Sequence, residues 1–143
     1  MSHAKVELGR RLFYDRRLSA NGTQSCASCH QQARAFTEPR ATSLGSTGEA
    51  HVRNAMSLAN VAYATRLNWA DPDTDRLEDQ ALTPLFGDDP IELGLDEATL
   101  LERLGGDPEY RARFEVAFAD EAPAERLTAS TVTKALAAFQ RAL

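Results

Sequence analysis

The two cysteines of this chain lie in one short stretch, Cys26-Ala27-Ser28-Cys29-His30. This CxxCH spacing is the attachment pattern of c-type haem, in which each thiol forms a thioether with one vinyl group of the porphyrin. The adjoining turn brings His30 beneath the iron, where an imidazole serves as the proximal ligand. We therefore expect one haem c, attached through Cys26 and Cys29 and ligated through its iron by His30.

Three other interpretations of the same residues remain open. A structural zinc site needs four ligands, and only His3 and His51 are left to complete one, at poor spacing. A thioredoxin-like redox pair needs a βαβ context, which the sequence does not suggest. A disulfide, or two buried thiols, would leave the adjacent His30 without a role.

Composition limits the class of protein. The chain has 143 residues and a net charge of −5, which fits a single globular domain over residues 1–143 and argues against nucleic acid as a partner. No apolar run approaches the ~18 residues of a membrane span. The first residues contain no apolar signal-peptide core. Haem c attachment requires an oxidising compartment, so we expect a periplasmic protein whose leader has been removed.

The hydrophobic pattern predicts an all-α fold with long loops that wrap the covalently attached haem. Short helices are expected over residues 6–14, 55–63 and 77–85. Asp96 is a candidate N-cap for a helix closed by Gly105 and Gly106, and Asp107-Pro108 opens the next one. Thr128 or Ser130 caps a last helix that runs to the final residue. A loop as long as residues 21–53 is uncommon in a compact domain, and a large ligand around which it folds would explain it.

The motifs around the CxxCH resemble those of the bacterial di-haem cytochrome c peroxidase and MauG family. The similarity runs through residues 7–30, 51–71 and 77–95 and reaches the C-terminal VTKALAAFQRAL. The motifs GSTGEAH, RNAMSLANVAY and FGDDPIELGL most resemble those of the MbnH-like subgroup, whose members oxidise a tryptophan of a partner protein. The family has a second CxxCH domain, and this sequence contains one CxxCH. The resemblance thus implies the N-terminal, peroxidatic haem domain alone, ending after Leu143.

The resemblance implies roles for two residues on the distal side of the haem. Glu92 matches the acid–base glutamate that moves a proton between the oxygens of hydrogen peroxide. Without the resemblance, Glu92 would be interpreted as a solvated residue beside Asp88 and Asp89. Gln80 matches a distal glutamine that hydrogen-bonds peroxide or water, and otherwise reads as an amide on a helix surface. These two residues are about two positions further apart than in the cytochrome c peroxidases of the family.

Other positions follow from the same resemblance. Trp69 matches the aromatic residue between the two haems, where it relays an electron, and otherwise reads as a core aromatic. Asn54 matches an asparagine on an inter-haem calcium ion, whose hard charge favours oxygen ligands. Arg53 and Arg40 are candidates for pairing with the haem propionates, and Arg53 is preferred.

The sixth iron ligand stays open at this point. His51 is a candidate distal ligand, but it lies closer to Arg53 than the corresponding histidine of the di-haem peroxidases, so a propionate or surface contact is favoured. Met56 is a second candidate, although methionine in an apolar segment is more often core. Phe36, Leu44, Leu58 and Phe86 are expected to line the haem pocket.

Two functions follow from these expectations. The first is a peroxidase-like domain that activates hydrogen peroxide and oxidises a partner redox protein or protein substrate together with a second haem domain. The second is a monohaem electron-transfer module, six-coordinate through His51 or Met56, without peroxide chemistry.

Overall fold

The computed structural model describes residues 1–69 and 73–143, so the end of the 51–71 segment quoted above lies outside the described residues. Regular structure in these two ranges is helical, with isolated β-bridges and no strand, which confirms the all-α prediction. The α-helices are α1 (His3–Tyr14), α2 (Cys26–Cys29), α3 (Leu77–Gln80), α4 (Leu82–Phe86), α5 (Glu97–Gly105), α6 (Pro108–Ala117) and α7 (Ala129–Gln140). The 3₁₀ helices are η1 (Arg16–Leu18), η2 (Gln32–Arg34), η3 (Val61–Tyr63) and η4 (Pro123–Glu125).

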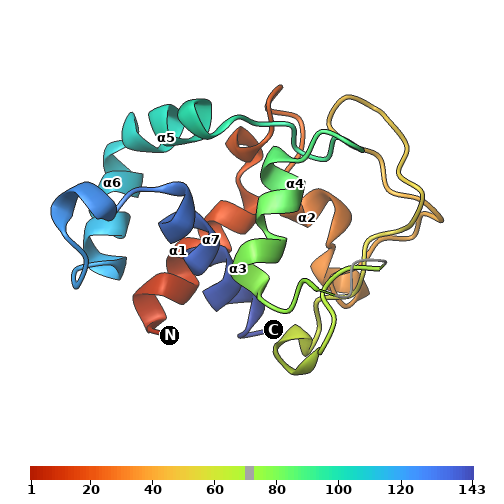
Figure 1. The fold of residues 1–143 in the computed structure, drawn as a ribbon, viewed down its shortest axis with the longest axis horizontal. Helices are drawn as coiled ribbons and strands as arrows, with labels where there is room; N and C mark the ends of the chain where they lie inside the picture. The colour runs from red at the N-terminus through yellow and green to blue at the C-terminus, as the bar shows by residue number, and fades with distance from the viewer. Residues whose placement is uncertain (70–72) are drawn as a thin grey trace.

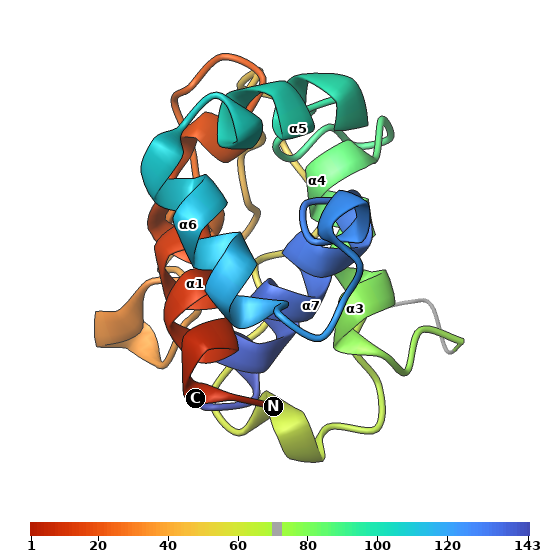
Figure 2. The same cartoon turned by 90° about the vertical axis from the view of Figure 1, so that its left-hand side faces the viewer.

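The centre of the fold is the contact between α1 and α7 (Figures 1 and 2). Gly9 lets the two helices approach closely, because a Cβ at this position would lie 1.9 Å from the carbonyl oxygen of Ala135. Leu8, Leu12 and Phe13 of α1 are fully buried, as are Val132 and Leu136 of α7. Each such side chain contributes about 1.5–3 kcal/mol when it is removed from water.

The predicted starts of the C-terminal helices are confirmed. The Asp96 carboxylate accepts a hydrogen bond from the Thr99 amide at 2.9 Å, and α5 ends at Gly105 as expected. Asp107 caps α6, whose first residue is Pro108. Thr128 rather than Ser130 caps α7. Such side chains satisfy amide groups that have no partner within the helix.

Four expected boundaries are wrong, and the first is the start of α1, which lies at His3 rather than at residue 6. Residues 55–63 form an extended loop with one 3₁₀ turn, since Asn60 adopts a left-handed conformation (φ 59°) and the loop is tied to other segments. The Thr37 hydroxyl donates to the Ala55 carbonyl at 2.5 Å, and the Ser57 hydroxyl donates to the Ala35 carbonyl at 2.6 Å. The helix over 77–85 is divided at Ala81 into α3 and α4, and the last helix ends at Gln140.

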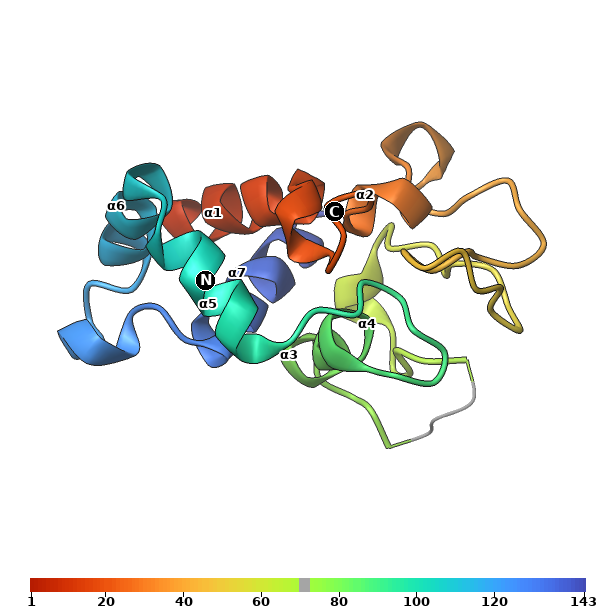
Figure 3. The same cartoon turned by 90° about the horizontal axis from the view of Figure 1, so that it is seen from above.

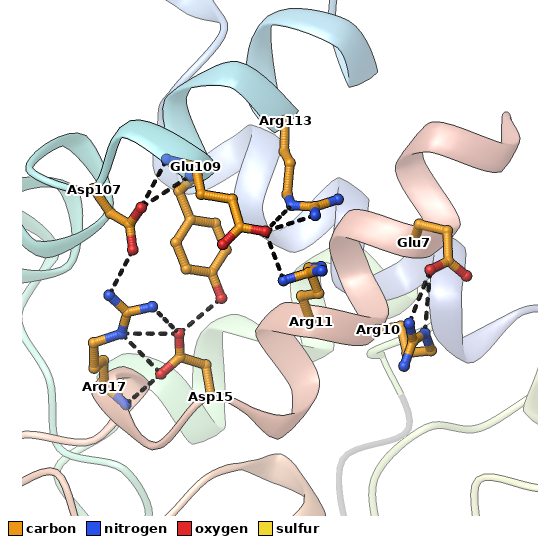
Figure 4. A network of polar contacts seen from close by, with 9 residues as sticks. Glu7, Arg10, Arg11, Asp15, Arg17, Asp107, Glu109 and Arg113 are labelled. Carbon is orange, nitrogen blue, oxygen red and sulfur yellow. Dashed lines mark hydrogen bonds and ion pairs between the residues drawn. The ribbon is translucent and has the colours of Figure 1, made fainter.

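The end of α1 is fixed to α6 by a polar network (Figure 4). Arg17 contacts Asp15 at 2.8 Å and Asp107 at 2.9 Å, and the Tyr110 hydroxyl donates to Asp15 at 2.7 Å. Burial alone would raise the pKa of Asp15, but the hydrogen bonds from Arg17 and Tyr110 outweigh it and hold that pKa below its usual value. The network therefore stabilises the turn that connects α1 to the CxxCH segment.

Helices α5 and α6 and the long loops occupy opposite sides of the molecule (Figure 1). Helices α5 and α6 lie on one side of the α1–α7 pair, and residues 35–67 lie on the other (Figures 1 and 3).

No helix in the described part of the chain has the length and apolar character that crossing a bilayer requires.

Candidate haem site

A cavity of about 310 Å³ lies where the loops meet α2, α3, α4 and α7. Residues that the sequence analysis singled out share its wall: Cys26, Cys29, His30, His51, Arg53, Asn54, Met56, Trp69, Gln80 and Glu92. Leu44 and Leu58 also line it, whereas Phe36 and Phe86 do not. The structure thus brings these candidates together although Cys26 and Glu92 are 66 positions apart, and Phe13 of α1 and Gln140 of α7 line the same cavity.

The CxxCH segment presents a neutral imidazole to this cavity. The one-turn helix α2 is closed by the His30 amide, which donates to the Cys26 carbonyl at 2.9 Å. The His30 Nδ1 lies 2.9 Å from the Phe36 carbonyl oxygen. Because a carbonyl only accepts, Nδ1 carries the proton and Nε2 keeps its lone pair for a metal. Burial lowers the pKa of His30, while the carbonyls of Phe36 and Met56 act in the opposite direction.

The two thiols are protonated and free of a disulfide. Burial raises the pKa of Cys26 to about 12 and that of Cys29 to about 11, with Glu92 and Glu38 among the neighbouring charges that act in the same direction. A redox-active thiol pair needs the opposite shift, toward the thiolate. The structure therefore argues against the thioredoxin-like interpretation.

Glu92 is half-buried at the cavity wall, unlike its exposed neighbours Asp88 and Asp89. Burial raises the pKa of Glu92, and the nearby His51 opposes this shift. A carboxyl group with a raised pKa is suited to proton exchange near neutral pH. The alternative interpretation, in which Glu92 is a solvated residue of an acidic loop, does not agree with this half-buried position.

Glu92 is held in place by the loop around Gly45, which the sequence analysis did not identify. The Ser46 amide donates to the Glu92 carbonyl at 2.7 Å, and the Ser46 hydroxyl donates to the Leu93 carbonyl at 3.1 Å. A Cβ on Gly45 would lie 1.8 Å from the Ile91 carbonyl oxygen, so only glycine permits this approach. The glycines in GSTGE were visible in the sequence, but nothing in it showed the partner segment.

Gln80 and Trp69 lie on the side of the cavity formed by α3 and the preceding loop. The Gln80 amide donates to Asn68 Oδ1 at 3.4 Å. The Trp69 indole donates to the Asn54 carbonyl at 2.9 Å, and Arg53 lies over the ring at 5.7 Å. Trp69 is 52% exposed, so the alternative of a core aromatic is wrong.

The remaining candidates divide into two groups. His51, Asn54 and Met56 line the cavity. Arg40 lies outside it, 4.0 Å from the buried carboxylate of Glu38, which leaves Arg53 as the arginine at the site.

The site fits a covalently attached haem. His51 Nε2 and Gln140 Oε1 are buried without a hydrogen-bond partner, and both residues line the cavity. Buried polar atoms of this kind cost about 1–3 kcal/mol each unless a ligand or water satisfies them. Two free thiols, an imidazole with an available Nε2 and a largely apolar wall complete the donor set that haem c requires. Among residues 1–69 and 73–143, no three His, Cys, Asp or Glu side chains gather as a metal site, so the four-ligand zinc interpretation finds no support.

Comparison with known proteins identifies the family. A family model described as di-haem cytochrome c peroxidase matches residues 3–143. The methylamine utilization protein MauG of Methylorubrum extorquens is 37% identical over 139 residues, which cover 97% of this chain and 38% of that protein. The cytochrome-c peroxidase IdrP1 of Denitromonas iodatirespirans is 38% identical over 141 residues, covering 99% of this chain and 36% of that protein.

A solved structure gives the same result. The crystal structure of a MauG-like protein associated with microbial copper homeostasis superposes with a TM-score of 0.93 at 49% sequence identity, covering 99% of this chain and 41% of that one. The chain belongs to the di-haem cytochrome c peroxidase family, a family of peroxidase enzymes that use haem c. It spans less than half the length of the relatives it matches.

Proposed function

We propose that this chain is a haem c-dependent, peroxidase-like oxidoreductase domain that activates hydrogen peroxide and passes the oxidising equivalents to a partner protein or redox carrier. The observation that supports this most strongly is one cavity whose wall carries both the CxxCH segment and Glu92, a half-buried carboxyl with a raised pKa. Family membership supports the same chemistry.

The proximal side of the site would hold the cofactor. Cys26 and Cys29 would form the thioethers, and His30 would ligate the iron through Nε2 while Phe36 fixes the ring. The haem, when bound, supplies the two electrons that cleave the O–O bond of peroxide. Arg53 would pair with a propionate.

The distal side of the site would handle protons and orientation. Glu92 would accept the proton from the oxygen of peroxide nearer the iron and return it to the other oxygen, which leaves as water. Gln80 would donate a hydrogen bond to the bound peroxide or water. Because the far oxygen leaves as water only once it is protonated, the position of the Glu92 carboxyl would govern how readily that proton is returned.

Two residues at the exposed edge of the site, Trp69 and Asn54, are proposed to face the partners of this domain. Trp69 is half-exposed at the mouth of the cavity and is proposed as the electron relay to a second haem domain. Asn54, whose carbonyl holds the indole, is proposed as one ligand of a calcium ion between the domains. Thioether formation needs reduced cysteines delivered to an extracytoplasmic compartment, which supports a periplasmic location.

The role of Glu92 is tested by Glu92→Gln in the haem-loaded chain, with Asp88→Asn as a control. Asp88 lies in the same segment, is exposed and does not line the cavity. We expect peroxide consumption to fall by about 10²–10⁴-fold in Glu92→Gln and to be unchanged in Asp88→Asn. Equal rates in both variants would remove Glu92 from the proposal.

A second candidate function is a six-coordinate electron-transfer module. The buried Nε2 of His51, which has no partner, favours it, because a lone pair at the cavity wall is available to iron. In that case His51→Ala would convert a low-spin spectrum into a high-spin one, whereas an open distal face predicts no change of spin state.

A further inference from the structure

A cluster of aromatic rings connects His30 with the protein surface at the end of α1. The ring of Phe13 lies 6.4 Å from the His30 ring and 5.4 Å from the ring of Tyr14. Phe139 and Phe36 complete the cluster, each within 6.4 Å of another member. The phenylalanine and tyrosine rings meet edge to face, and the Phe13 ring is tilted by 46° to the His30 ring.

Tyr14 is the one member of this cluster with an oxidisable phenol at the surface. It is 43% exposed, whereas Phe13 and Phe139 are buried. Its hydroxyl donates to Gln32 Oε1 at 3.3 Å. The hydroxyl remains exposed to water, and a water molecule can accept its proton. A phenol gives up an electron far more readily than a phenylalanine ring once its proton can leave.

Charged groups of both signs surround Tyr14. It lines a second concavity, of about 470 Å³, whose wall carries the carboxylates Asp15 and Glu109 and the arginines Arg10, Arg11, Arg16, Arg17 and Arg113. Several of these arginines are paired with carboxylates (Figure 4). Water reaches the phenol beside these groups, so electron loss from Tyr14 is coupled to release of its proton.

We propose that Tyr14 is a second oxidation site of this domain, at which an oxidising equivalent leaves the haem through Phe13 and reaches the surface. The proposal rests on the peroxidase function proposed above, which names hydrogen peroxide as the oxidant. One peroxide leaves two oxidising equivalents at the haem site of one chain and becomes two waters. Tyr14 fills one of them, losing one electron to the haem site and its hydroxyl proton to water, and the redox carrier or partner protein proposed above supplies the other electron. When two such molecules meet, their phenoxyl radicals couple through a carbon–carbon bond to dityrosine.

The other two tyrosines of the chain serve as internal controls. Tyr63 is 86% exposed but has no aromatic ring contact within the described residues. Tyr110 is 5% exposed, its ring contacts Phe114, and its hydroxyl is occupied by Asp15. Oxidation by free peroxide or by diffusing radicals would follow exposure and favour Tyr63, whereas transfer through the ring cluster favours Tyr14.

The test treats the haem-loaded chain with one equivalent of hydrogen peroxide, follows peroxide consumption, and maps dityrosine by peptide mass spectrometry. We expect a cross-link between Tyr14 peptides that is lost in Tyr14→Phe and retained in Tyr63→Phe, with peroxide consumption equal in all three proteins. Phe13→Leu should also lower the yield. Phe118→Leu, which removes an equally buried ring that contacts Phe114 and not the cluster, should not.

Each outcome decides the proposal. Consumption of peroxide with Tyr14 unmodified, or with Tyr63 modified in its place, overturns the second oxidation site and leaves the peroxidase function standing. Peroxide that is not consumed overturns both. A Tyr14 cross-link that survives Phe13→Leu at full yield shows that the oxidant reaches Tyr14 from solvent, and also overturns the proposed route.

Discussion

Replacing Gly45 with alanine tests how the site is positioned. The new Cβ would lie 1.8 Å from the Ile91 carbonyl oxygen, so the two segments must separate by about 1.6 Å to reach ordinary contact at 3.4 Å. That separation disrupts the hydrogen bonds that Ser46 makes with Glu92, Leu93 and Asn21, which are 2.7, 3.1 and 2.7 Å long. At about 1 kcal/mol each, their loss amounts to about 3 kcal/mol.

The same movement displaces Glu92, which Ile91 directly precedes. We expect Gly45→Ala to lower the Tm by about 10 °C. In the haem-loaded chain, a misplacement of about 1 Å in the reacting geometry predicts a loss of about 100-fold in the rate of peroxide reduction. Thermal unfolding followed by circular dichroism and stopped-flow peroxide kinetics measure the two effects.

Gly105→Ala is the matched control. A Cβ at Gly105 would meet Leu127 at 3.5 Å, an ordinary contact, and alanine is the better helix former. This variant should be as stable and as active as the parent chain. If Gly45→Ala behaves like Gly105→Ala, the close approach of the Gly45 loop does not position Glu92.

Three further predictions concern protonation and capping. Because burial raises the pKa of Glu92, the peroxide rate should increase with pH through a midpoint above the usual value of about 4.3, and Glu92→Gln should show a flat profile over that range in stopped-flow measurements. The pKa of Asp15 is depressed in the fold, so its contribution to stability is present above its unfolded value of about 3.9 and is lost as the pH falls through the folded one; the difference in urea midpoint between the parent and Asp15→Asn should therefore shrink in acid, and a constant difference would contradict this. Thr128→Ala removes the cap of α7 and should cost about 1 kcal/mol in urea unfolding, whereas Ser130→Ala, which removes no cap, should cost less.

Local signals in the sequence were sufficient for the C-terminal helices. Asp96, Asp107 and Thr128 cap the helices that follow them because a side-chain oxygen next to unpaired amides acts over a few residues. The apolar residues of 55–63 suggested a helix, but this segment is a loop. Ala55, Met56, Leu58 and Val61 line the cavity, whereas Tyr63 is exposed. Hydrogen bonds from this segment go to Thr37 and Ala35.

The residues of the site were predictable in type but not in arrangement. Cys26, Cys29 and His30 are adjacent in the sequence, so their spacing indicated haem c without the fold. Glu92 and the Gly45 loop meet only through contacts between distant segments, which no local pattern encodes. For the same reason the buried, unpartnered Nε2 of His51 was visible only in the structure.

We propose that haem c is attached at Cys26 and Cys29, ligated by His30, and open to peroxide on the side of Glu92. The visible spectrum of the haem-loaded chain in the ferric state, recorded before and after one equivalent of hydrogen peroxide, tests this most directly. We expect a high-spin ferric spectrum that changes on mixing. A low-spin spectrum that peroxide leaves unchanged would contradict it and would make His51 the first residue to examine as a sixth ligand.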